Sequence, residues 1–199
     1  MKYEPAPLPF SKTPEGISEK TLTIHHDKLY VGYVNKKNEI EEKLLPLMQG
    51  GDVASANQSY SELRALLDGL TFSANGTYLH EWYFESLAGA GVPQGPFADA
   101  LIARFGSMEN FLKFFAAAGM AARGWAVLAW DTKSQALQVY IGDAHNQGGV
   151  WGAVPVLVMD VYEHAYFLDY GSDRKAYIES YLKQLNWDRL NELYTSASR

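Results

Sequence analysis

Five histidines are the residues of this chain best suited to carry chemistry, because the sequence contains no cysteine. Without thiolates, a metal ion would have to be held by histidine, carboxylate and water. The segment DVYEHAYF, which follows the apolar run VPVLVM, contains Asp160, Glu163 and His164. Burying an unpaired charge is costly, so such groups usually face a partner, a metal or solvent. Either Asp160 caps a helix whose first turn contains Glu163 and His164, or Asp160 and His164 bind a metal.

Two further histidines could complete such a metal site. His25 lies on the first long helical segment, and His80 lies in the middle of a later one. Three imidazoles and one carboxylate suit iron or manganese better than magnesium or calcium, and the lack of thiolates disfavours zinc and copper(I). Spacing alone does not show that these residues converge, since a single histidine is more often a surface or core residue than a ligand.

Aromatic residues accompany these candidate ligands. Tyr33 lies eight residues after His25, roughly two turns along the same helix. Trp125 begins a short apolar segment, and Tyr162 lies inside DVYEHAYF. An aromatic wall excludes water and holds ligands rigid, two properties that a redox metal site uses. Aromatic stripes also form ordinary cores, so these residues support a metal site only in combination with the histidines.

The composition argues against several classes of function. The net charge is −6, and no window clusters the lysines and arginines that phosphate contacts need, so we expect no nucleic-acid partner. No apolar run approaches the roughly 20 residues that span a bilayer. The amino-terminal MKYEPAPLPF carries prolines where a signal peptide needs a continuous apolar core. We therefore expect a cytoplasmic protein without a membrane partner.

The elements that must position these residues are helices in the first half of the chain. Helical spacing of apolar residues begins at Thr21 and ends at the sequence MQGG. Two more helical segments are predicted over residues 53–70 and 75–87. The stretch AGAGVPQG that follows is rich enough in glycine and proline to be an interdomain linker.

Strands are predicted only in the second half. FADALIARF and SMENFLKFFAAAGM read as two helices, the second capped by Ser107. GWAVLAWD and ALQVYIG alternate around the turn TKSQ, which is typical of two antiparallel strands, and VPVLVMD gives a third. Residues 161–194 are predicted to be helical again, with a break at DYGSD.

Several of these segments together resemble one known family. DVYEHAYF resembles the DVWEHAYY signature of the iron and manganese superoxide dismutases. IHHDKLYVGYV is similar to that family's first-helix motif, NGTYLHEWYFESL to its second-ligand segment, and RGWAVLAW to its glycine-tryptophan strand. The resemblance implies an α+β fold with an N-terminal helical hairpin domain over residues 1–90. A C-terminal α/β domain, residues 91–199, would hold a three-stranded antiparallel sheet surrounded by helices.

The same resemblance implies the chemistry. One iron or manganese ion per subunit would cycle between the +3 and +2 states and convert superoxide to dioxygen and hydrogen peroxide. The ligands that the family motifs match are His25, His80, Asp160 and His164, with a solvent molecule as the fifth. Tyr33 would be the gatekeeper near the substrate channel, and Arg174 resembles the basic residue that draws the anion inward. Trp125 and Tyr162 would belong to the surrounding aromatic wall.

Members of the family are dimers or dimer-based tetramers. Glu163 matches the glutamate that crosses the dimer interface to the ligand histidine of the other subunit, the position of His164. Leu29 and Phe167 stand where the family usually has a histidine and a tyrosine that hydrogen-bond across the interface. Losing both polar partners leaves an apolar contact that can be nearly neutral for stability. We expect a contact between Leu29 and Phe167 of different subunits.

The group that holds the metal-bound solvent departs from the usual pattern. Family members commonly use a glutamine, either four residues before the second ligand, where this chain has Gly76, or from the sheet region. By its spacing to Asp160, His145 fits the histidine that some archaeal and metal-tolerant members use, and Gln147 is the rival. A histidine ring titrates near neutrality, whereas a glutamine amide does not titrate, so the choice between iron and manganese stays open.

Two alternative functions stay open alongside dismutation. A superoxide dismutase-like protein could bind metal with impaired turnover, although such a protein is expected to have lost ligands. A non-haem iron oxygenase uses two histidines and one carboxylate with open positions for dioxygen and a cosubstrate. A third histidine and a tight aromatic wall favour a smaller substrate.

Overall fold

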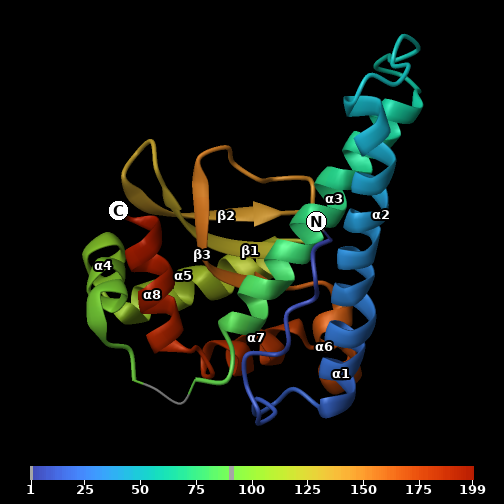
Figure 1. Cartoon of the computed structure of the whole chain (residues 1–199). Coiled ribbons are helices and arrows are strands. Elements are labelled where there is room, and N and C mark those ends of the chain that lie inside the picture. Colours follow the sequence, from blue (N-terminus) through green and yellow to red (C-terminus); the bar gives the residue numbers. More distant parts are fainter. Residues whose placement is uncertain (1, 90–91) are drawn as a thin grey trace.

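The two halves of the chain form different kinds of structure (Figure 1). The computed structural model describes residues 2–89 and 92–199. The first half is helical, and the second contains a three-stranded sheet with helices around it, which confirms the predicted fold class. The predicted domain boundary, between residues 90 and 91 inside the AGAGVPQG linker, lies outside the described residues. Within the described part, no helix is both long and apolar enough to cross a membrane.

The first half is a long helical hairpin that projects beyond the sheet (Figure 1). Its first arm is one continuous run of helix: α1 is Glu19–Thr23, the π-helix η1 is Ile24–Tyr30 and α2 is Val31–Met48. Its second arm is α3, Glu62–Glu85. Ser61 starts α3 by accepting a hydrogen bond from the Arg64 backbone N–H, which satisfies one of the free donors of the first turn.

The prediction of separate helices over residues 53–70 and 75–87 was wrong, because α3 is a single helix and residues 53–61 precede it without helical structure. The Asn57 side chain accepts hydrogen bonds from the backbone N–H groups of Ser59 and Tyr60, so this segment turns on itself. No proline interrupts residues 71–74, and the helix continues through them. Asn75 and His80 therefore share one rigid element.

The second half agrees with the predicted elements. Its helices are α4 Gly95–Phe105, α5 Met108–Ala121, α6 Glu163–Tyr170, α7 Arg174–Leu182 and α8 Trp187–Ala197. Its strands are β1 Trp125–Asp131, β2 Ala136–Gly142 and β3 Ala153–Asp160, in the antiparallel order β2-β1-β3. The predicted cap is confirmed, since the Ser107 side chain accepts a hydrogen bond from the Asn110 backbone N–H. The sheet register pairs Trp125 with Asp160, at the end of β3.

The hairpin and the sheet share one core. Helix α3 packs against β3 on one side, while α5 and α8 pack against the sheet (Figure 1). Val34, Tyr83, Leu128 and Tyr181 belong to the same cluster of buried residues, although they come from both halves. Because burial of apolar surface ties the halves together, side chains at the seam are held in fixed positions.

Candidate metal centre

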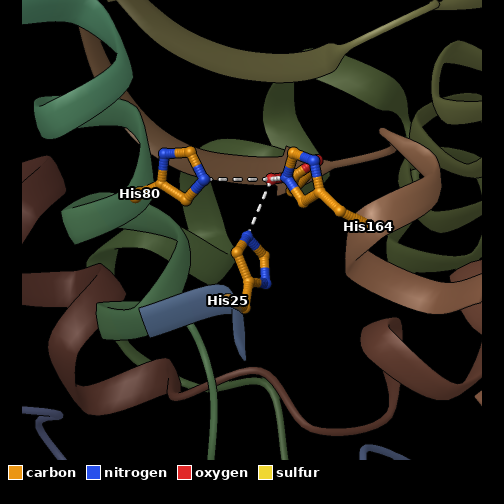
Figure 2. A group of neighbouring side chains, drawn as sticks. His25, His80 and His164 are labelled. Atoms are coloured by element: carbon orange, nitrogen blue, oxygen red, sulfur yellow. Dashed lines mark hydrogen bonds and ion pairs between the residues drawn. The ribbon is translucent and has the colours of Figure 1, made fainter. Parts of the chain in front are cut away.

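Three histidines and one aspartate converge where the hairpin meets the sheet (Figure 2). His25 comes from η1, His80 from α3, Asp160 from the last position of β3 and His164 from α6. Their possible ligand atoms all lie within 4.8 Å of one another. The Nε2 atoms of His25 and His164 each lie 3.1 Å from Asp160 Oδ2, and that of His80 lies 3.6 Å away. The cluster is therefore compact enough to hold one metal ion.

The π-helix η1 aligns His25 with Tyr33. In a regular α-helix, eight residues make about 2.2 turns and leave two side chains roughly 80° apart around the axis. The wider turns of a π-helix bring eight residues closer to two full turns. The Tyr33 ring accordingly lies 5.3 Å from the His80 ring, on the side of the helix that carries His25. Helical spacing alone did not predict this irregular segment.

The Asp160 carboxylate is held by the backbone as well as by the histidines. Its Oδ1 accepts a hydrogen bond from the Tyr162 N–H at 2.9 Å, while Oδ2 faces the three imidazoles. The hydroxyl of Tyr177 donates to the backbone carbonyl of Asp160 at 2.7 Å. The interpretation of Asp160 as a helix cap was wrong, because the N-cap of α6 is Tyr162 and no described side chain caps that helix. One oxygen of Asp160 instead accepts from the residue before the helix, and the other faces the cluster. Sequence reasoning missed Tyr177, whose only signal was its place in SDRKAYI.

The protonation of His80 fits a cation at this position. Its Nδ1 lies 2.5 Å from the Gly76 carbonyl oxygen, so Nδ1 carries the proton and donates it. Its Nε2 then carries only a lone pair, which faces Asp160 Oδ2 and has no hydrogen-bond partner. His80 and Asp160 are both fully buried. Two facing lone pairs repel each other in a buried site, and a metal ion between them would remove the conflict.

Burial and charge set the protonation of the four cluster residues. Burial alone would raise the pKa of the Asp160 carboxyl, but the charge of His164 and hydrogen bonds from His164 and His25 outweigh it and hold the pKa well below its usual range. Burial lowers the pKa of His25 and lowers that of His80 further. Burial also lowers the pKa of His164, yet attraction to Asp160 outweighs this and leaves it raised. The cluster thus keeps an anionic carboxylate beside two neutral imidazoles, as a cation site requires.

His145, and not Gln147, lies against the cluster. The His145 ring is buried, 5.8 Å from the His80 ring and 4.7 Å from the Tyr33 ring, whereas Gln147 is exposed. The Trp125 indole N–H donates to His145 Nδ1 at 2.9 Å, so the neutral ring carries its proton on Nε2. Burial lowers the pKa of His145 to about 4, which keeps the ring neutral near pH 7.

Gly76 makes room for His145. A Cβ atom at position 76 would lie 2.9 Å from the Tyr33 ring and 3.2 Å from His145 Cδ2, closer than real Cβ atoms normally approach. The adjacent Asn75 donates from its side chain to the His145 backbone carbonyl at 2.8 Å. Sequence reasoning singled out Gly76 but missed Asn75. The small residue and the histidine are therefore complementary, since the space that a side chain would take at position 76 is filled by Tyr33 and His145.

The remaining predicted residues lie in three different settings. Tyr162 stacks on the His164 ring at 5.2 Å and belongs to the aromatic wall with Trp125. Arg174 donates to the Tyr166 hydroxyl and to the Ala122 carbonyl, so its guanidinium supports local structure as well as providing charge. The residues assigned to a subunit interface lie at the surface of the chain: Glu163 and Phe167 are exposed, and Leu29 is partly exposed.

The comparisons with known proteins identify the class. The chain belongs to the iron/manganese superoxide dismutase family: residues 2–88 match its alpha-hairpin domain and residues 93–193 its C-terminal domain. A manganese superoxide dismutase of Halobacterium salinarum is 38% identical over 99% of this chain and 97% of its own length. An iron superoxide dismutase of Aquifex aeolicus is 41% identical over 93% of this chain and 87% of its own length. Relatives of both metal types are thus similar to this protein.

Proposed function

We propose that this protein is a superoxide dismutase that forms dioxygen and hydrogen peroxide at one iron or manganese ion per subunit. The proposed ligands are His25, His80, Asp160 and His164. The observation that carries the proposal is the bare Nε2 of His80, which faces a buried carboxylate oxygen inside a cluster of three imidazoles. The bound ion would supply the one-electron chemistry by alternating between the +3 and +2 states. A role in defence against oxidative stress would follow.

His145 would act as a fixed hydrogen-bond donor beside the ion. Its Nδ1 is occupied by the Trp125 N–H, which leaves the Nε2–H free to hold a solvent molecule next to the cluster. A donor in this position adjusts the protonation of the solvent and hence the balance between oxidation states. Tyr33 would guard the approach to the ion. Burial and the nearby Asp160 raise the pKa of its phenol, so the hydroxyl stays protonated.

A homodimer built on α6 is the assembly that we propose. Glu163 lies in the first turn of α6 beside His164, and Phe167 and Leu168, each 52% exposed, continue the same surface. Contact of Leu29 with Phe167 of another copy would bury apolar surface that is otherwise exposed to solvent. The cytoplasmic location and the absence of nucleic-acid and membrane partners stay predictions from the sequence.

Replacing Phe167 with glutamate is expected to convert the dimer to a smaller species. A charged side chain in an apolar contact would lose its hydration without gaining a partner. Sedimentation measures the mass, and Met120→Glu on α5, at a site 51% exposed, serves as the matched control. An unchanged mass for Phe167→Glu would contradict the α6 interface.

The proposed activity is tested by loading metal-free protein with iron and with manganese separately. We expect superoxide dismutation in proportion to the bound metal for at least one of the two. Full occupancy without dismutation in both samples would contradict the proposal and favour a metal-binding protein without turnover. Dioxygen consumption driven by an organic substrate would instead indicate an oxygenase.

Acid is expected to release the metal as the pH falls below the ordinary histidine pKa of about 6.5, because protons compete with the ion for the imidazole ligands. The lowered pKa values of His25 and His80 mean that protons compete at these two ligands only at lower pH. His164, whose pKa is raised by Asp160 despite burial, should be protonated first. Metal content after dialysis at stepwise lower pH provides the measurement. Release already complete at pH 7 would contradict the expectation.

A further inference from the structure

Residues 2–10 form a strap along the helical hairpin. This strap has no regular secondary structure and runs beside the hairpin toward α1 (Figure 1). It is tied to α2, because the Tyr3 backbone N–H donates to the Asn38 side-chain oxygen and the Asn38 amide donates back to the Tyr3 carbonyl, both at 2.8 Å. Leu8 and Phe10, further along the strap, pack against the core. Hydrogen bonds and apolar contacts therefore hold the strap in place on the hairpin.

Glu81 is the point where the strap meets both arms of the hairpin. It follows His80 in α3, and its Oε1 accepts a hydrogen bond from the Tyr30 hydroxyl at 2.6 Å. Its Oε2 accepts from the Tyr3 hydroxyl at 2.9 Å, and the Tyr30 hydroxyl in turn accepts from the Ala6 backbone N–H at 2.8 Å. Burial and the hydrogen bond to Glu81 raise the pKa of the Tyr30 phenol, so it stays a donor. Strap, η1 and α3 are thus joined through one carboxylate, which forms stronger hydrogen bonds than a neutral acceptor does.

The same contacts anchor the π-helix η1 from outside. In η1 the Val31 N–H donates to the His26 carbonyl, five residues back. π-Helices are rare and occur mostly as short insertions at functional sites, so we expect outside contacts to hold this one against reversion to an α-helix. His26 Nε2 lies 2.9 Å from the Ala6 carbonyl oxygen, and Tyr30, the last residue of η1, is bound to Glu81. Both ends of the irregular segment are therefore fastened to the strap or to α3.

We propose that Tyr30 and Glu81 are positioning residues for the metal centre. Their hydrogen bond, fastened by the strap, keeps η1 in its π-helical form and so fixes His25 relative to His80. The inference rests on the ligand set proposed above. His25 and Tyr30 share η1, and His80 and Glu81 are neighbours in α3, so this one bond spans two helices that carry ligands. Its loss would let η1 revert to an α-helix, which would also turn Tyr33 out of line with His25.

The test loads the full-length protein with cobalt(II). Imidazole and carboxylate ligands bind cobalt(II) more tightly than iron(II) or manganese(II), and its visible absorption bands report how the ligands are arranged. Tyr30→Phe removes the hydroxyl that binds Glu81 and Ala6. We expect the bands of the fully loaded variant to shift. In competition with a chelator, its affinity for cobalt should fall about 10- to 100-fold, as is typical when a group that supports a metal ligand is removed.

Variants at Glu81 separate the hydrogen bond from the bulk of the side chain. Glu81→Ala removes the acceptor and should act as Tyr30→Phe does. Glu81→Gln keeps an oxygen that can accept from Tyr30 and Tyr3, so it should recover part of the wild-type bands and affinity. Asn38→Ala unfastens the strap from α2 while placing a better helix former there, and we expect a smaller change in the same direction.

Tyr140→Phe is the matched control. The Tyr140 hydroxyl donates to Asp131 Oδ2 at 2.7 Å, a tyrosine-to-carboxylate hydrogen bond of the same kind. Asp131 ends β1, whereas Trp125, whose ring lies 5.1 Å from that of His80, begins it. Loss of this bond should therefore leave both the cobalt bands and the affinity at their wild-type values.

Each outcome decides the inference. Shifted bands and weaker binding in Tyr30→Phe and Glu81→Ala, with recovery in Glu81→Gln, support it. Unchanged bands and affinity in the first two variants overturn it, and lowered thermal stability alone would then show that Tyr30 and Glu81 only stabilise the hairpin. A wild-type protein that takes up no cobalt contradicts the ligand set and this inference together. Normal cobalt binding without dismutation by the iron or manganese forms contradicts the proposed activity and leaves this inference standing.

Discussion

Replacing Asp160 with asparagine is expected to cost the protein its metal. Asparagine keeps the shape, and its oxygen can still accept the Tyr162 N–H, but the negative charge that faces three imidazoles is lost. Changes to residues that only support metal ligands lower affinity by about 10- to 100-fold, so loss of an anionic ligand should exceed about 100-fold. Metal content after dialysis and dismutation activity should fall together. Thermal unfolding measures how far the metal had stabilised the folded chain.

Asp188→Asn provides the matched control, because Asp188 is an exposed carboxylate at the start of α8, outside the cluster. We expect this variant to keep wild-type metal content. Retention of metal by Asp160→Asn at the wild-type level would contradict the proposed ligand set, whatever the activity of the sample.

Replacing Gly76 with alanine is expected to lower activity by about 10- to 100-fold while metal stays bound. The added Cβ would collide with the Tyr33 ring and press on His145 Cδ2, and the resulting small shift of the imidazole would strain its hydrogen bond with Trp125. Alanine favours a helix by about 1 kcal/mol over glycine, so a loss of activity without a matching loss of stability would point to the position of His145. Activity per bound metal and thermal unfolding give the two readouts.

Two further variants sharpen this test. Gly32→Ala in α2 is the matched control, since a Cβ atom there would meet nothing within 4 Å. The double variant with Gly76→Gln and His145→Ala removes one of the two rings that crowd position 76 and offers an amide donor in place of the Nε2–H. We expect it to recover part of the activity and to alter both the pH profile and the ratio of iron-loaded to manganese-loaded activity. Full activity of Gly76→Ala with an unchanged pH profile would sink the assignment of His145.

The local features of this protein could be read from its sequence. Alternating apolar residues around TKSQ predicted the first two strands, and the cap at Ser107 was predicted from its residue type, because strand pairing and capping depend on neighbours in the chain. The family motifs pointed to His25, His80, Asp160 and His164 as a possible set. The prediction of a helix over residues 53–70, at the tip of the hairpin, was wrong, because helical spacing does not distinguish the Asn57 turn from the start of α3.

The tertiary structure decided what depends on distant segments. Only packing of η1, α3, β3 and α6 against one another brings the four side chains within 4.8 Å, because spacing along a chain does not fix distances across a core. The same packing turns His145 toward Trp125 and leaves Gln147 exposed, a choice that residue types left open. The proton on His80 Nδ1 and the room at Gly76 follow from contacts within and between helices and the sheet. The sequence thus specified the chemical groups, and burial at the seam between hairpin and sheet determined their positions and protonation.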